Sequence, residues 1–153
     1  MIMIMKKIFL YTVALVYTGL LLCHTSFAQN KPVAINPGPF ADNAGHWYSI
    51  ADKHNMINAR PGHPKYKPTD IREIGDNILL FQKDNGGWPK NYDIFAILTP
   101  DQKDSVQQGH SVLNTTYDNG STYTQVAALA QIYEATHEEK YKNAAIKGLN
   151  YII

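Results

Sequence analysis

The chain has 153 residues, with 14 lysines and arginines against 13 aspartates and glutamates, and a single cysteine, Cys23. A charge near zero with no basic run argues against nucleic acid as a partner, and one cysteine excludes a disulfide framework and a cysteine-based zinc site. The length allows one small domain.

Residues 1–28 have the features of a secretory signal. Lys6 and Lys7 precede an apolar run from Ile8 to Leu22, and a cleavage site of small residues ends at Ala28. The run is shorter than the ~20 residues that a membrane-spanning helix prefers. We therefore expect a secreted or periplasmic protein with no membrane contact after cleavage. Cleavage removes two lysines and no acidic residue, so the formal charge changes from +1 to −1.

Prolines divide the segments that follow. Residues 29–45 contain three prolines and no apolar period, which predicts an extended leader or linker. Residues 46–57 have helical apolar spacing, whereas residues 60–68 contain three more prolines and are expected to be irregular. From residue 46 to residue 153 we predict a single all-α region.

Helices over residues 70–83, 100–108, 123–135 and from 137 onwards follow from apolar spacing and start signals. The expected caps are Thr69, Thr99, Thr122 and Thr136, and the last three form capping-box patterns with Gln102, Gln125 and Glu139. The expected buried stripes are Ile71, Ile74, Ile78 and Phe81; Val126, Leu129, Ala130 and Tyr133; and Tyr141, Ala144, Ala145, Leu149 and Ile152. The last two helices are joined by a short turn, which makes them antiparallel neighbours.

Residues 84–91 form the first candidate binding segment, Asp-Asn-Gly-Gly-Trp-Pro-Lys-Asn. Its glycine pair permits a sharp turn, Trp88 offers a flat face for a sugar ring, and Lys90 offers a charge for a carboxylate. The alternative interpretation is a helix stop followed by a tryptophan that packs in the core.

Residues 118–125 form the second segment, Asp-Asn-Gly-Ser-Thr-Tyr-Thr-Gln. Asp118 lies four residues before the expected cap, so its carboxylate is free to point into a cleft and to contribute to a calcium site. Calcium takes six to eight oxygen ligands, which substrate carboxylates would have to complete. The alternative interpretation is an Asx-turn that leads into the next helix.

These two segments, followed by Ala135-Thr-His-Glu-Glu-Lys-Tyr141, resemble the first part of the catalytic domain of pectate lyases of polysaccharide lyase family 10. The resemblance implies a partial α/α toroid built of helical hairpins, with residues 46–153 as its N-terminal portion. Because the apolar pattern of the last helix runs to Ile153, we expect this portion to be truncated.

The resemblance also implies calcium-assisted β-elimination on polygalacturonate. Asp118 would serve the calcium or substrate site, and Trp88, Lys90 and Asn91 would line the cleft. The family's catalytic base is an arginine, and neither Arg60 nor Arg72 matches it. We therefore expect the base beyond Ile153 and an inactive fragment. Two alternatives stay open, which are a carbohydrate-binding toroid without a base and a toroid glycoside hydrolase that acts on uronides with two carboxylates.

Overall fold

The computed structural model describes residues 32–49, 60 and 62–153, and these residues belong to one compact unit. The described part is all-helical, as predicted, and contains five α-helices, two short 3-10 helices and no strand. A single bridge between Lys65 and Ala96 is the β-type pairing found in this part. None of its helices has the length and apolar character needed to cross a membrane.

The N-terminal elements are η1 (Gly38–Phe40) and α2 (Ala41–Ser49). The prediction of an extended leader is therefore wrong from residue 38 on, and Ile35 and Phe40 are buried in the core. The physical reason is that a proline in the first turn of a helix loses no hydrogen bond, so the prolines near residue 38 start a helix instead of preventing one. The rest of the helix predicted over residues 46–57 lies outside the described residues.

Helix α3 (Ile71–Phe81) is the centre of the core, because Ile74, Ile78 and Phe81 are buried on one face as the apolar spacing predicts. Its N-cap is Asp70, so the predicted cap at Thr69 is wrong. The Asp70 carboxylate accepts a hydrogen bond from the Lys67 backbone N–H at 2.8 Å and does not cap the helix by its side chain.

Helix α4 (Pro100–Gln108) has the predicted capping box, in which Thr99 and Gln102 bond to each other's backbone N–H groups, and it ends at Gly109. A long loop leads to η2 (Asp118–Gly120), a 3-10 turn within the second candidate segment.

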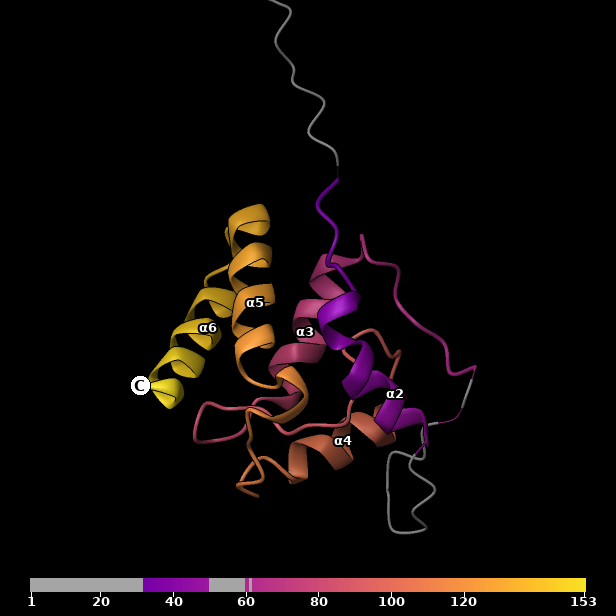
Figure 1. Cartoon of the computed structure of the whole chain (residues 1–153). Coiled ribbons are helices and arrows are strands. Elements are labelled where there is room, and N and C mark those ends of the chain that lie inside the picture. Colours follow the sequence, from indigo (N-terminus) through magenta and orange to yellow (C-terminus); the bar gives the residue numbers. More distant parts are fainter. Residues whose placement is uncertain (1–31, 50–59, 61) are drawn as a thin grey trace, which may run out of the picture. The chain divides into compact units, whose positions relative to one another are not determined.

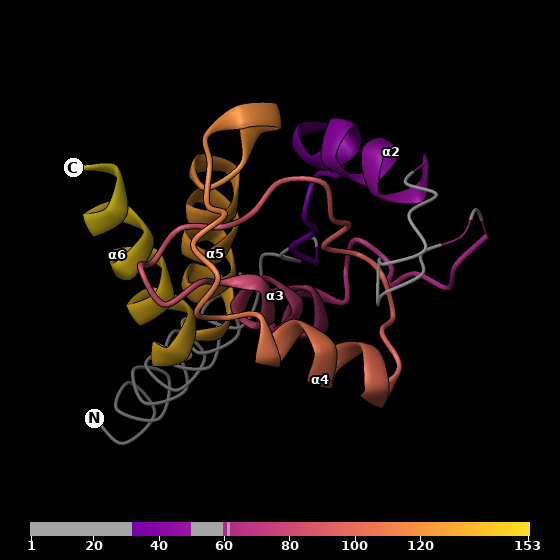
Figure 2. The same cartoon turned by 90° about the horizontal axis from the view of Figure 1, so that it is seen from below.

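Helices α5 (Tyr123–Thr136) and α6 (Glu139–Ile152) form the predicted antiparallel hairpin, and α3 packs against α5 (Figures 1 and 2). The hairpin buries Leu129 and Ile132 from α5, and Tyr141 and Ala144 from α6. The stripe prediction was wrong at its edges: Ala130 is exposed, Leu149 is 45% exposed and Ile152 is 40% exposed.

Candidate functional site

The two candidate segments meet on the surface, although 26 residues of sequence separate them. The ammonium group of Lys90 forms an ion pair with the carboxylate of Asp118. The side-chain amide of Asn119 lies 3.0 Å from Asn91 Oδ1. Lys90, Asn91 and Asp118, which the sequence predicted as site residues, therefore lie together in the structure.

A residue that the sequence did not indicate completes this group. Asp42, in the first turn of α2, places its Oδ2 atom 3.0 Å from the Asn119 amide, and the same amide atom is 3.3 Å from Asp118 Oδ1. We call Asp42, Lys90, Asn91, Asp118 and Asn119 the Asp118 cluster. The two carboxylates thus approach the same atom of one amide, in a cluster that three chain segments build.

Unusual backbone at both segments makes this meeting possible. Asn91 and Asn119 have φ values of 63° and 53°, in the left-handed region that asparagine tolerates better than most residues. Thr122 has φ 70° and ψ −60°, and the Tyr123 N–H donates to the Ser121 carbonyl at 3.0 Å. These values describe a classic γ-turn, which is a strained conformation for a β-branched residue.

Thr122 is the N-cap residue of α5, as predicted, but the predicted capping box with Gln125 is absent because the Thr122 hydroxyl has other partners. It accepts a hydrogen bond from the Trp88 backbone N–H at 3.1 Å and donates one to the Thr116 carbonyl at 2.9 Å. The side chain is fully buried. Thr122 therefore holds the two candidate segments against each other and does not satisfy the first turn of the helix.

Trp88 is not a sugar platform in this structure. Its side chain is fully buried, and its indole N–H donates to the Ile78 carbonyl at 2.7 Å. The alternative interpretation of a core tryptophan is therefore the correct one for its ring. Solvent reaches the rings of Tyr117, the residue before Asp118, and of Tyr123, the first residue of α5, which are 48% and 54% exposed.

Lys83 directly precedes the first candidate segment, and its side chain is also buried. Its ammonium group donates to the Gly109 carbonyl at 2.6 Å. Burial lowers the pKa of Lys83, because a charged ammonium loses hydration when it leaves water. This lysine ties the loop after α4 to the start of the first segment.

The electrostatics of the Asp118 cluster depend mainly on the Lys90–Asp118 pair. The hydrogen bond from Lys90, followed by the charge of Lys90, holds the pKa of the Asp118 carboxyl below its usual range. Both side chains are about half exposed, so solvent screens the pair and it contributes little to stability. Because this exposed pair is weak, another cation can replace Lys90 at Asp118, and another anion can replace Asp118 at Lys90.

The Asp118 cluster fits a calcium ion only when an anionic ligand binds together with the ion. Asp42 and Asp118 supply carboxylate oxygens, and the nearby asparagines supply amide oxygens, which are the ligands calcium prefers. Within residues 32–49, 60 and 62–153, no group of three histidine, cysteine or acidic side chains is arranged to hold a metal ion. A full shell would need oxygens from water and from the ligand.

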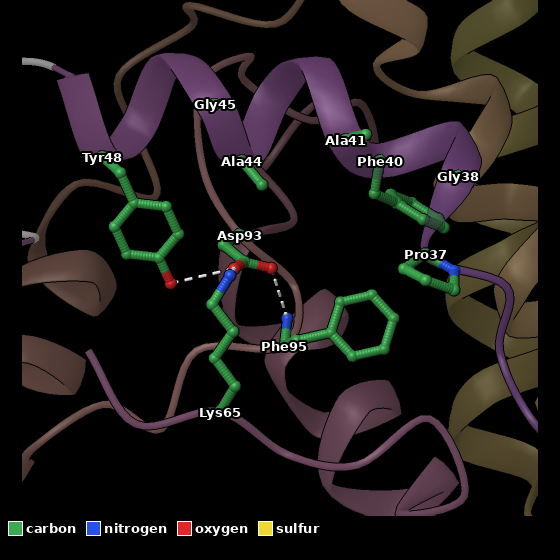
Figure 3. A pocket seen from close by; sticks show the side chains of 10 residues that line it. All are labelled: Pro37, Gly38, Phe40, Ala41, Ala44, Gly45, Tyr48, Lys65, Asp93 and Phe95. Atoms are coloured by element: carbon green, nitrogen blue, oxygen red, sulfur yellow. Dashed lines mark hydrogen bonds and ion pairs between the residues drawn. The ribbon is translucent and has the colours of Figure 1, made fainter. Parts of the chain in front are cut away.

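A separate cavity of about 450 Å³ lies beneath α2 (Figure 3). At its floor the buried carboxylate of Asp93 accepts hydrogen bonds from the Tyr48 hydroxyl at 2.9 Å and the Phe95 N–H at 2.9 Å, and it pairs with Lys65 at 2.8 Å. Burial, followed by the charge of Asp93, raises the pKa of Tyr48. These bonds join α2 to the loop before α4, so we interpret the group as structural.

Comparison with known families gives one finding. The family model described as pectic acid lyase matches residues 82–153, a range that includes both candidate segments and the α5–α6 hairpin. Neither the curated proteins nor the solved structures gave a match to this chain.

Proposed function

Residues 82–153 belong to the pectic acid lyase family, and from this premise we propose that the protein is an exported pectate lyase that cleaves polygalacturonate by calcium-assisted β-elimination. The observation that carries the proposal is that the family match covers both candidate segments, and that Lys90 and Asp118 of these segments are in contact.

The reaction needs a base and a group that offsets negative charge. The base takes the proton from C5 of a uronate, a double bond forms between C4 and C5, and the glycosidic oxygen at C4 leaves. Negative charge grows on the C6 carboxylate as the proton departs, so cations placed there lower the barrier. A bound calcium ion would supply this offset at the substrate carboxylate.

The residues of the Asp118 cluster suit the binding part of this task. Asp118 and Asp42 would hold the calcium ion from the protein side, and the substrate carboxylate would complete its shell. Lys90 would leave Asp118 when the metal arrives and would pair with a uronate carboxylate, as a lysine point charge does. Asn91 would orient the sugar through its amide.

We propose that the base lies outside the described residues. Arg72 is in an exposed ion pair with Glu138, and that pair joins α3 to the start of α6. Arg60 lies in the proline-rich stretch, where the sequence gives no match to the family's base. We therefore assign the role of the base to neither arginine.

The α5–α6 hairpin, with α3 against it, supports the proposal of a toroid assembled from such hairpins. Export remains a proposal that depends on the signal features of residues 1–28, which lie outside the described residues. The substrate fits this location, because pectic acid is a polymer too large to enter a cell unaided.

The test is the production of unsaturated uronide from polygalacturonate by the full natural gene product, followed by ultraviolet absorbance with and without calcium. Asp118→Asn should abolish calcium-dependent turnover, whereas Asp104→Asn, at an exposed position of α4, should leave it unchanged. Turnover that survives in the Asp118 variant with the same calcium requirement would refute the assigned role.

The products also separate the two alternatives. Saturated oligouronides would indicate a glycoside hydrolase, for which Asp42 and Asp118 would be the carboxylates to test first. Binding of polygalacturonate without any product would indicate a carbohydrate-binding protein.

A further inference from the structure

One buried side chain, that of Asn43 in α2, contacts both candidate segments. Its relative exposure is 1%. The amide oxygen accepts a hydrogen bond from the Asn91 backbone N–H at 2.7 Å, and the amide nitrogen donates to the Asn119 carbonyl at 2.9 Å. Asn43 is 48 residues from the first partner and 76 from the second.

The two partners of Asn43 are the two asparagines with left-handed backbone. Lys90 directly precedes Asn91, and Asp118 directly precedes Asn119, so each charged side chain is one residue away from a bond to Asn43. A shift of either turn would therefore move one member of the ion pair relative to the other.

A third contact strengthens this arrangement. The hydroxyl of Ser121 lies 3.4 Å from both polar atoms of the Asn43 amide and donates to the Pro89 carbonyl at 3.3 Å. The amide of Asn43 is thus satisfied on its donor and acceptor sides, within a network that includes both turns. A fully satisfied buried network fixes one arrangement of its parts, since any other leaves polar groups unpaired.

We propose that Asn43 is a positioning residue, whose amide sets the separation of Lys90 and Asp118 and so the geometry in which the cluster receives a uronate carboxylate together with a cation. The identity of that ligand rests on the proposed function, whereas the role of the amide rests on the contacts above. Asn43 lies outside the segment that matches the family, so the N-terminal part of the chain contributes to the site.

The chain offers a matched control in Asn77. Its side chain is 3% exposed, and its amide donates to the Ile94 and Ala96 carbonyls at 3.0 and 2.6 Å. Like Asn43, it is a buried asparagine that holds a loop from a helix. Its partners lie three and five residues after Asn91 in the same loop, but its side chain bonds to neither turn of the cluster. It therefore reports the general cost of losing such a side chain.

The experiment compares Asn43→Ala and Asn77→Ala in the full natural gene product by two measurements. The first is amide hydrogen–deuterium exchange over residues 89–91 and 118–121. The second is the Kd for trigalacturonate in the presence of calcium. We expect Asn43→Ala to speed exchange in both turns and to weaken binding by about tenfold, as the loss of a well-made buried hydrogen bond implies. Asn77→Ala should do neither, at a comparable loss of thermal stability.

A second variant keeps the proposal testable if Asn43→Ala does not fold. Asn43→Asp retains the acceptor for the Asn91 N–H but has no donor for the Asn119 carbonyl, so exchange should rise over residues 118–121 and stay unchanged over 89–91. Exchange in the turns that matches the Asn77 variant would overturn the proposal. If the wild-type protein binds no trigalacturonate, the proposed function fails, and the exchange measurements still decide whether Asn43 holds the turns together.

Discussion

The indole ring of Trp88 lies directly against Gly148 of α6. A Cβ atom at position 148 would be 2.6 Å from Trp88 Cζ3 and 2.6 Å from Val126 Cγ2. Both distances are far below van der Waals contact, so the α5–α6 hairpin can close over the first candidate segment only with glycine at this position. Through this contact the core packing of the hairpin fixes the segment that carries Lys90.

Gly148→Ala should therefore destabilise the protein by about 1–3 kcal/mol, the usual cost of overpacking a filled core. The matched control is Gly45→Ala in α2, where an added Cβ meets nothing within 4 Å. Alanine is preferred to glycine inside a helix, so the control should stabilise by up to about 1 kcal/mol. Urea unfolding measures both. Equal effects of the two substitutions would contradict the packing argument.

The caps of the helices show what local sequence can and cannot predict. The capping box of Thr99 is confirmed: Thr99 and Gln102 are exposed or half-buried, and each bonds to the other's backbone N–H. Thr122 has the same pattern with Gln125, yet its hydroxyl bonds to the Trp88 N–H, which is buried and must be satisfied. Tertiary contacts decide between partners, and a pattern four residues long does not contain them.

Thr99→Ala should cost about 1 kcal/mol of stability, because it removes the side-chain acceptor for the first turn of α4. Thr69→Ala serves as the comparison, since Thr69 is exposed and does not cap α3. Its effect should stay within about 0.5 kcal/mol. Chemical denaturation of the two variants tests the assignment, and a larger loss for Thr69→Ala would reverse it.

The ionisation of Tyr141 makes the free energy of unfolding depend on pH in the alkaline range. Its hydroxyl lies 3.1 Å from the Arg72 carbonyl and 3.0 Å from Asp76 Oδ1, and burial, with a smaller effect of Asp76, raises the pKa of Tyr141 to about 12. The unfolded chain releases this proton near pH 10 and the folded protein releases it later. The stabilisation is therefore complete below pH 10 and is lost as the pH rises towards 12.

Tyr141→Phe should lower stability at neutral pH by about 1 kcal/mol, through the lost hydrogen bonds, and should lose less stability than the wild type above pH 10. The two curves of unfolding free energy against pH should thus converge. Tyr123→Phe, at an exposed ring, should leave the alkaline slope unchanged. Parallel curves for the wild type and the Tyr141 variant would show that another group controls the alkaline loss.

The sequence predicted only those site residues that lie within the two candidate segments. Lys90, Asn91 and Asp118 were identified from the resemblance of two short segments, and the structure brings these residues together. Asp42 and Asn43 were missed because three prolines favoured a linker there, although proline followed by an acidic residue also marks the start of a helix. Their partners are distant in sequence, and no local periodicity reports such contacts.

Lys90 and Asp118 give the last prediction, which concerns calcium. Lys90→Gln removes the cation that now occupies Asp118, so the carboxylate becomes available to a metal ion in the absence of substrate. We expect the affinity for calcium alone to rise by about twofold to fivefold, since an exposed ion pair is weak. The affinity for trigalacturonate at saturating calcium should fall, because Lys90 would otherwise pair with a uronate.

Isothermal titration with calcium chloride, and then with trigalacturonate, measures the two affinities separately. Lys103→Gln, an exposed lysine of α4, controls for the change in net charge and should alter neither affinity by more than its small effect on long-range attraction. The opposite signs of the two changes are the essential result. If Lys90 exchanges partners, its loss raises the affinity for calcium and lowers the affinity for trigalacturonate. A loss of both affinities would instead show that Lys90 supports the structure of the cluster.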